Sequence, residues 1–89
     1  MNAIISVVGK DSVGILARVS NVCEKCNANI VDVSQTVLKD YFAMVMVVNI
    51  DNLNREFTKF IDSFSCVSEN KNVDIHIMHE DIFNAMHKI

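Results

Sequence analysis

Residues 9–16 read Gly9-Lys10-Asp11-Ser12-Val13-Gly14-Ile15-Leu16, and an apolar strand pattern changes into a helical pattern within them. Before this stretch, Ala3 to Val8 is nearly all apolar and rich in β-branched residues, which predicts a strand. From Ser12 to Cys26, apolar residues recur at helical spacing, which predicts a helix. Asp11 and Ser12 are both suitable N-caps, so we expect Gly14 in the first turn of that helix.

A glycine in the first turn of a helix costs stability, so its presence indicates another use for a missing side chain. One interpretation is the close approach of a ligand, because the unpaired N–H groups and the dipole of a helix start favour a carboxylate or phosphate. The alternative is a tight turn between strand and helix that binds nothing. The spacing alone leaves both interpretations open.

The chain beyond Cys26 predicts three further strands. Asn27-Ala28-Asn29 ends the first helix, because Asn tolerates the left-handed conformation. Ile30 to Leu38 and Phe42 to Val48 flank the two-residue turn Lys39-Asp40 and therefore form a hairpin. The period-two positions expected on one face of the first of these strands are Val31, Val33 and Val37. A last strand follows, with one face in the core, where Val73, Ile75 and Ile77 alternate with Asp74, His76 and Met78.

Two further helices complete the pattern. Asp51 to Asn54 is a polar break that supplies a cap, and a single apolar stripe follows it at helical spacing: Leu53, Phe57, Phe60, Ile61 and Phe64. Glu69 to Asn72 reads as a loop. The tail from Glu80 to Ile89 forms a short helix with one apolar side: Ile82, Phe83, Met86 and Ile89.

The order is therefore β-α-β-β-α-β followed by a terminal helix, which predicts an α+β fold. Right-handed crossovers give the ferredoxin-like sandwich, a four-stranded antiparallel sheet with two helices on one face, plus a short C-terminal helix. At 89 residues, the chain is expected to form a single domain over 1–89.

Composition limits the function. The net charge is -3 and the eight Lys and Arg residues are scattered, which argues against nucleic-acid binding. The longest apolar run, Tyr41 to Val48, is far shorter than the roughly 20 residues that a membrane helix needs. There is no signal-peptide pattern, and three cysteines cannot all pair within one chain, so we expect a cytoplasmic protein without a cofactor.

The chemistry-bearing residues form no recognisable catalytic or metal site. Cys23-Glu24-Lys25-Cys26 falls in the last turn of the first predicted helix, where the dipole disfavours a thiolate, so we interpret both cysteines as buried core residues. His76 and His79 point to opposite faces of a strand and cannot share a metal ion. Together with His87, they are expected at the surface or an interface.

A small enzyme is a weaker hypothesis. Acylphosphatase has this topology and length. The resemblance would imply a Gly-rich loop that presents an arginine to phosphate. The corresponding loop here offers Lys10 but no arginine. Ser6, Ser12 and Ser34 have no His nearby in the sequence that would make a nucleophile–base pair. We therefore expect a non-catalytic protein.

The strand from Phe42 to Val48 is apolar on both faces, although a sheet with helices on one face should be polar on the other. Exposed apolar faces and open strand edges usually mark interfaces, which predicts a homodimer formed edge to edge or by packing of the sheets. The terminal helix could cover part of this surface in a partner or, alternatively, in its own chain.

With these elements placed, the sequence resembles an ACT domain over nearly its whole length. The family pattern has a first strand, a loop reading Asp-Arg-Pro-Gly before two aliphatic residues, a helix, and a second strand that begins Asn-Ile. Asp11, Gly14, Ile15 and Leu16 match the loop, Ser12 and Val13 stand where the family has Arg-Pro, and Asn29-Ile30-Val31-Asp32 matches the second strand. The run Ala17 to Ser20 is similar to modules of the glycine-cleavage-repressor type. The tail Glu80 to His87 resembles small stand-alone ACT proteins of uncharacterised function.

The resemblance implies a regulatory protein. ACT domains commonly pair side by side and bind a small amino acid at the interface, between the first loop of one subunit and the second strand of its partner. By position, Asp11 lies in that loop, and backbone amides of Ser12, Val13, Gly14 and Ile15 would hold the ligand carboxylate. Asn29 and Asp32 would be candidates to meet its ammonium group and orient the ligand, and Ile30 lies beside them in the implied site.

The resemblance therefore implies a dimeric sensor that binds an amino acid or similar metabolite and acts through an unidentified partner protein. The alternative is a protein-interaction module that binds no small molecule. Binding or failure to bind any of the twenty amino acids separates these two hypotheses.

Overall fold

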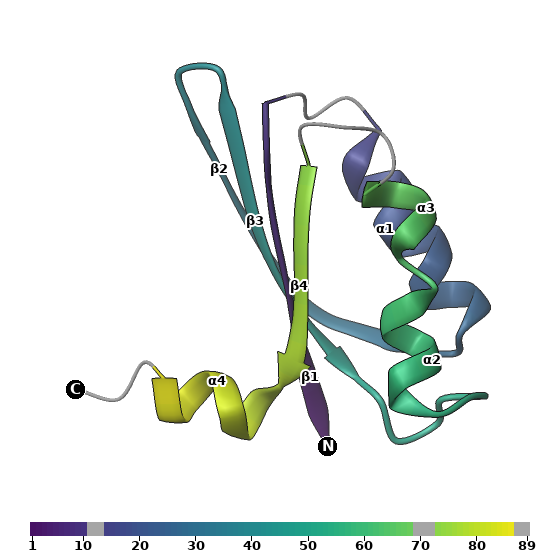
Figure 1. The fold of residues 1–89 in the computed structure, drawn as a ribbon. Helices are drawn as coiled ribbons and strands as arrows, with labels where there is room; N and C mark the ends of the chain where they lie inside the picture. The colour runs from purple at the N-terminus through teal and green to yellow at the C-terminus, as the bar shows by residue number, and fades with distance from the viewer. Residues whose placement is uncertain (11–13, 69–72, 87–89) are drawn as a thin grey trace.

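A computed structural model of the chain describes residues 1–10, 14–68 and 73–86. Four strands form one antiparallel sheet in the order β2-β3-β1-β4: β1 (Asn2–Gly9), β2 (Asn29–Leu38), β3 (Tyr41–Asn49) and β4 (Val73–His79). Three helices lie on one side of the sheet: α1 (Ile15–Lys25), α2 (Phe57–Asp62) and α3 (Ser65–Ser68). A fourth helix, α4 (Glu80–Met86), lies on the other side (Figure 1). The predicted ferredoxin-like sandwich with a short C-terminal helix is confirmed.

The core lies between the sheet and α1, α2 and α3. Every second residue of the two central strands points into it, because side chains alternate between the faces of a strand. The buried residues of these strands are Ala3, Ile5 and Val7 in β1 and Phe42, Met44, Met46 and Val48 in β3. The helical side supplies Ile15, Val19, Val22, Cys23, Phe60, Phe64 and Val67. We call this side of the sheet the helix face and the opposite side the far face.

Two residues in the left-handed conformation end local elements where the sequence predicts a turn. Asn27, with φ 63°, follows the end of α1. Lys39, with φ 56°, lies in the two-residue turn that joins β2 to β3, and Leu38 pairs with Tyr41 across it. The predicted hairpin and the predicted end of the first helix are both confirmed.

The second helix begins later than predicted and is divided into two helices. Asp51 to Asn54 does not cap it: the N-cap is Glu56, in extended conformation, and a turn at 63–64 separates α2 from α3. Asn54 of this loop instead donates hydrogen bonds to the end of α1. Asn54 donates from its backbone N to the carbonyl of Cys26 (3.1 Å) and from its Nδ2 to that of Lys25 (2.8 Å). Because these bonds satisfy the C-terminal carbonyls of α1, they hold Asn54 outside a helix.

The predicted period-two pattern of β2 fails at Val31. A bulge shifts the register, so that Ile30 pairs with Val48 while Asp32 pairs with Val47. A one-residue shift moves every later side chain to the other face. Val33 and Val37 therefore share the helix face with Ile30, whereas Val31 is the extra residue and Asp32 lies on the far face.

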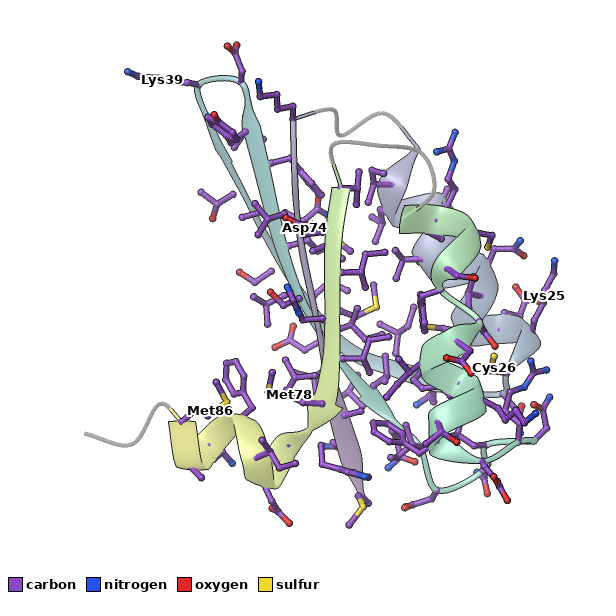
Figure 2. The ribbon with its side chains drawn as sticks, viewed as in Figure 1. Lys25, Cys26, Lys39, Asp74, Met78 and Met86 are labelled. Atoms are coloured by element: carbon purple, nitrogen blue, oxygen red, sulfur yellow. The ribbon has the colours of Figure 1, made fainter. Side chains whose placement is uncertain are left out.

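The far face carries apolar residues, as expected from the sequence. Ile4 on this face is buried, but Val8 and Val45 are exposed, and α4 lies at the end of the sheet where β4 finishes (Figure 1). Figure 2 shows Met78 and Met86 on this side and Cys26 among the helices of the other. The terminal helix thus covers part of the far face of its own chain, and Ile89 lies outside the described residues. Within the described part, no helix is long and apolar enough to cross a membrane.

Candidate functional site

The start of α1 differs from the sequence-based expectation in the place of its glycine. Gly14 is the N-cap with φ 75° and ψ 0°, rather than a residue of the first turn. A side chain at Gly14 would approach no closer than 4.0 Å to the nearest atom outside its chain neighbours, the Nε of Arg18. Packing of the described residues therefore leaves space here, and the left-handed backbone is what favours glycine. Asp11, Ser12 and Val13 lie outside the described residues.

Backbone amides at this helix start have no acceptor within the helix. The first intrahelical bond runs from the N of Arg18 to the O of Gly14, at 3.0 Å. The N–H groups of Ile15, Leu16 and Ala17 therefore donate to no carbonyl of α1. Ile15 is 3% exposed, so its side chain belongs to the core and only its backbone could serve a ligand.

Arg18 is a candidate that the sequence interpretation missed. Its guanidinium lies near Gly14, one helical turn away in sequence. The spacing of four residues was the available signal, since residues at i and i+4 lie on the same side of a helix. A cation beside the first amides of a helix, at the positive end of its dipole, makes the start of α1 suited to an anion.

The start of β2 forms one side of an open groove of about 640 Å³, and the last turns of α1 form the other. The groove contains two of the predicted residues, Asn29 and Ile30. The sequence interpretation assigned no binding role to the other residues that line it: Ser20, Cys23, Glu24, Asn27, Ala28, Asn49 and Asn52. No sequence signal identifies them together, because they come from α1, the end of β3 and the loop that follows each.

Some polar groups in this groove form hydrogen bonds with one another or with neighbouring residues. Asn27 donates from Nδ2 to the carbonyl of Asn52 (2.7 Å), and the Oδ1 of Asn49 accepts from the N of Asp51 (3.0 Å). The side chain of Asn29 has no hydrogen-bond partner within the described ranges, nor has the carboxylate of Glu24. Glu24 lies in the last turn of α1, near the negative end of its dipole, and no Lys or Arg is among the described residues that line the groove. The groove therefore suits an ammonium or a neutral polar group.

Asp32 does not join this groove. The bulge at Val31 directs Asp32 to the far face, opposite Val47, where its Oδ1 accepts from the N of Val33 (2.9 Å). In the single chain, Asp32 therefore lies apart from the groove that Asn29 lines.

Within one chain, the start of α1 and the start of β2 are also kept apart. They flank opposite ends of α1, which has 11 residues and is about 16 Å long. Figure 1 shows that α1 runs along the sheet, so that its two ends lie apart. One chain consequently offers an anion-favouring end and an ammonium-favouring end without joining them.

The cysteines of the C-x-x-C are buried, as predicted. Cys23 and Cys26 are both free thiols with no exposed surface. Burial, followed by the proximity of Cys26, raises the pKa of the Cys23 thiol to about 11. A thiol with so high a pKa is a poor nucleophile at neutral pH. Among residues 1–10, 14–68 and 73–86, no three His, Cys, Asp or Glu residues are grouped to hold a metal ion.

The histidines of β4 lie on opposite faces, as predicted, but only one is a surface residue. His76 is exposed on the far face, where it pairs with Ser6. His79 is half-buried: its ring stacks on Phe57 with centroids 4.1 Å apart, and its buried Nδ1 has no partner within the described residues. The sequence predicts a surface or interface position for His79, and in the single chain Phe57 covers one side of its ring. His87 lies outside the described residues.

Comparisons with known proteins indicate one family and one fold for this chain. The family model described as the ACT domain matches residues 2–77. A UPF0237 protein of Listeria monocytogenes is 47% identical, over 100% of both chains. An ACT domain protein from Streptococcus pneumoniae has a TM-score of 0.78 and 44% identity, over 98% of both chains. A putative glycine cleavage system transcriptional repressor shares the fold, with a TM-score of 0.72 and 13% identity over 85% of this chain and 44% of its own.

Proposed function

The chain belongs to the ACT-domain family, and we propose that it is a non-catalytic regulatory module that binds a small amino acid between two copies of itself. ACT domains are regulatory modules that bind amino acids or related metabolites and commonly dimerise. The proposal places the start of α1 of one copy against the start of β2 of the other. A partner protein would then respond to the occupied pair.

The observation that carries this proposal is the opposite character of the two ends of α1. Arg18 and the amides of residues 15–17 form an end that favours a carboxylate. Asn29 and Glu24 line a groove that favours an ammonium group. An α-amino acid carries both groups within a few ångströms, so it cannot span the about 16 Å that separates these ends in one chain. It could bridge them where two copies meet.

Thermal unfolding in the presence of each of the twenty amino acids tests the proposal. A ligand at 100 times its Kd adds about 2.7 kcal/mol of apparent stability, which should raise the Tm by at least about 10 °C. We expect Arg18→Glu and Asn29→Ala to abolish this shift. Gln35→Ala, an exposed change on the same strand as Asn29, is the matched control and should retain it.

Both outcomes of this experiment are informative. No Tm shift with any amino acid would contradict the proposal and favour the interaction module without a ligand. A shift that survives Asn29→Ala and Arg18→Glu would place the ligand elsewhere on the chain.

A further inference from the structure

The groove at the start of β2 is much larger than the ammonium group that it would hold in the proposed function. Its volume is about 640 Å³. An ammonium group is close in size to a water molecule, whose share of liquid volume is about 30 Å³. Pockets that enclose a whole small ligand have volumes of about 300–1,000 Å³. The groove can therefore accept the side chain of a bound amino acid as well as its α-ammonium group.

The charge in this groove has one sign. Among the described residues that line it, Glu24 alone is charged. Lys25, its neighbour in sequence, does not line the groove, and Figure 2 shows Lys25 pointing away from the sheet. Because adjacent residues of a helix do not face each other, Lys25 is not placed to pair with Glu24. An unpaired carboxylate near the negative end of a helix dipole favours a cation and disfavours an anion.

Neutral hydrogen-bond acceptors accompany this carboxylate. Asn27 donates from its Nδ2 to the carbonyl of Asn52 at 2.7 Å, which leaves its Oδ1 without a partner within the described residues. The side chains of Asn29 and Asn52 also form no hydrogen bond in that part of the chain. An ammonium or guanidinium group has three or five N–H donors and no acceptor, so it requires several acceptors at once. The groove offers one charged acceptor and several neutral ones.

We infer that this groove binds an alkyl-ammonium or guanidinium group through Glu24. The inference rests on the proposed function, in which this cation is the side chain of the bound amino acid and Asn29 meets its α-ammonium group. The ligand would then be a basic amino acid, and Glu24 would be the residue that selects it. Hydrogen bonds between charged groups are about twice as strong as neutral ones, so a basic side chain is favoured over a neutral polar one. An acidic ligand would place a second carboxylate beside Glu24 and would bind least.

Thermal unfolding of the whole protein with lysine, arginine, norleucine and cadaverine tests the inference. Norleucine is lysine without the ε-ammonium group, and cadaverine is lysine without the α-carboxylate. We expect lysine or arginine to raise the Tm by at least about 10 °C at 100 times its Kd. Norleucine at the same concentration should raise it far less, because it leaves Glu24 without a cation. Cadaverine should also raise it less than lysine, because the proposed function requires the carboxylate.

Glu24→Gln is the decisive variant, since it keeps the size of the side chain and removes its charge. Titration calorimetry should show that the variant binds lysine or arginine at least about tenfold more weakly, because a charge-assisted hydrogen bond is lost. Asp62→Asn is the matched control: it removes an exposed carboxylate from the last residue of α2, outside the groove, and should leave the affinity unchanged. Far-UV circular dichroism and thermal melts without ligand establish that both variants are folded.

The outcomes separate this inference from the proposed function. A norleucine shift equal to that of lysine, or an unchanged affinity for lysine in Glu24→Gln, would overturn the inference but leave a shared amino-acid site standing. A cadaverine shift as large as that of lysine, lost in Glu24→Gln, would support the cation-binding role of Glu24 and contradict the proposed function, since no carboxylate would be needed. No shift with any of the twenty amino acids or with cadaverine would overturn both.

Discussion

Gly14→Ala is the variant that best distinguishes the observed helix start from the one expected from sequence. In the structure, Gly14 is an N-cap with φ 75°, a conformation that costs an L-residue about 1–2 kcal/mol. A Cβ there would lie 4.0 Å from its nearest neighbour, the Nε of Arg18, so no clash adds to this cost. We therefore expect Gly14→Ala to lower the free energy of unfolding by about 1–2 kcal/mol.

Urea unfolding at equilibrium measures this change, and each kcal/mol should also lower the Tm by about 4–8 °C for a chain of this size. Gly14→Asn is the matched control, since asparagine adopts the left-handed conformation more readily than alanine and should lose less. A glycine in an ordinary first turn would behave in the opposite way, because alanine there would stabilise the helix by about 0.5–1 kcal/mol. An alanine variant as stable as the wild type, or more stable, would refute the reasoning.

Three further predictions concern the core and the thiols. Alkylation at pH 8 should label Cys66 in the native chain and reach Cys23 and Cys26 only on unfolding, because Cys66 alone of the three is exposed; rapid native labelling of all three would contradict the described burial. Stability should fall as the pH rises from about 9 towards about 11, because the unfolded state releases the Cys23 proton first; Cys23→Ala should flatten this loss, and an unchanged slope would assign it to other groups. Met46→Ala should cost about 2–5 kcal/mol in urea unfolding, because Met46 has no exposed surface, whereas Val45→Ala on the far face should cost much less; equal costs would place the core on the wrong face.

Much of the fold could be predicted because the spacing of the apolar residues and the residues at the turns indicate the same structure. Phe42 to Val48 alternates between faces, Lys39-Asp40 allows only a tight turn, and Asn27 tolerates the conformation that ends α1. In each case, local sequence and tertiary packing favour the same structure. The arrangement of the strands in the sheet, with the helices on one face, then follows from the handedness of the crossovers.

The predictions from sequence fail where one pattern of residues is compatible with two different structures. Ile30 and Val31 are both apolar, so the pattern does not reveal that Val31 is the bulged residue, nor that Asp32 lies on the far face. The stripe that begins at Leu53 is compatible with a longer helix, but the bonds from Asn54 to α1 are long-range and no local pattern encodes them. The same holds for the groove beside Asn29, whose lining comes from four segments of the chain.

The proposed site requires two copies, and mixing two defective variants tests this requirement most directly. Arg18→Glu alters the start of α1 and Asn29→Ala alters the start of β2, so neither variant alone should bind the amino acid found by thermal unfolding. When the two are unfolded together and refolded in equal amounts, half of the pairs contain one of each, and one of the two sites in such a pair is fully wild-type. Titration calorimetry should then recover about one quarter of the wild-type sites at wild-type affinity. Recovery of no binding in the mixture would contradict a site shared between two chains.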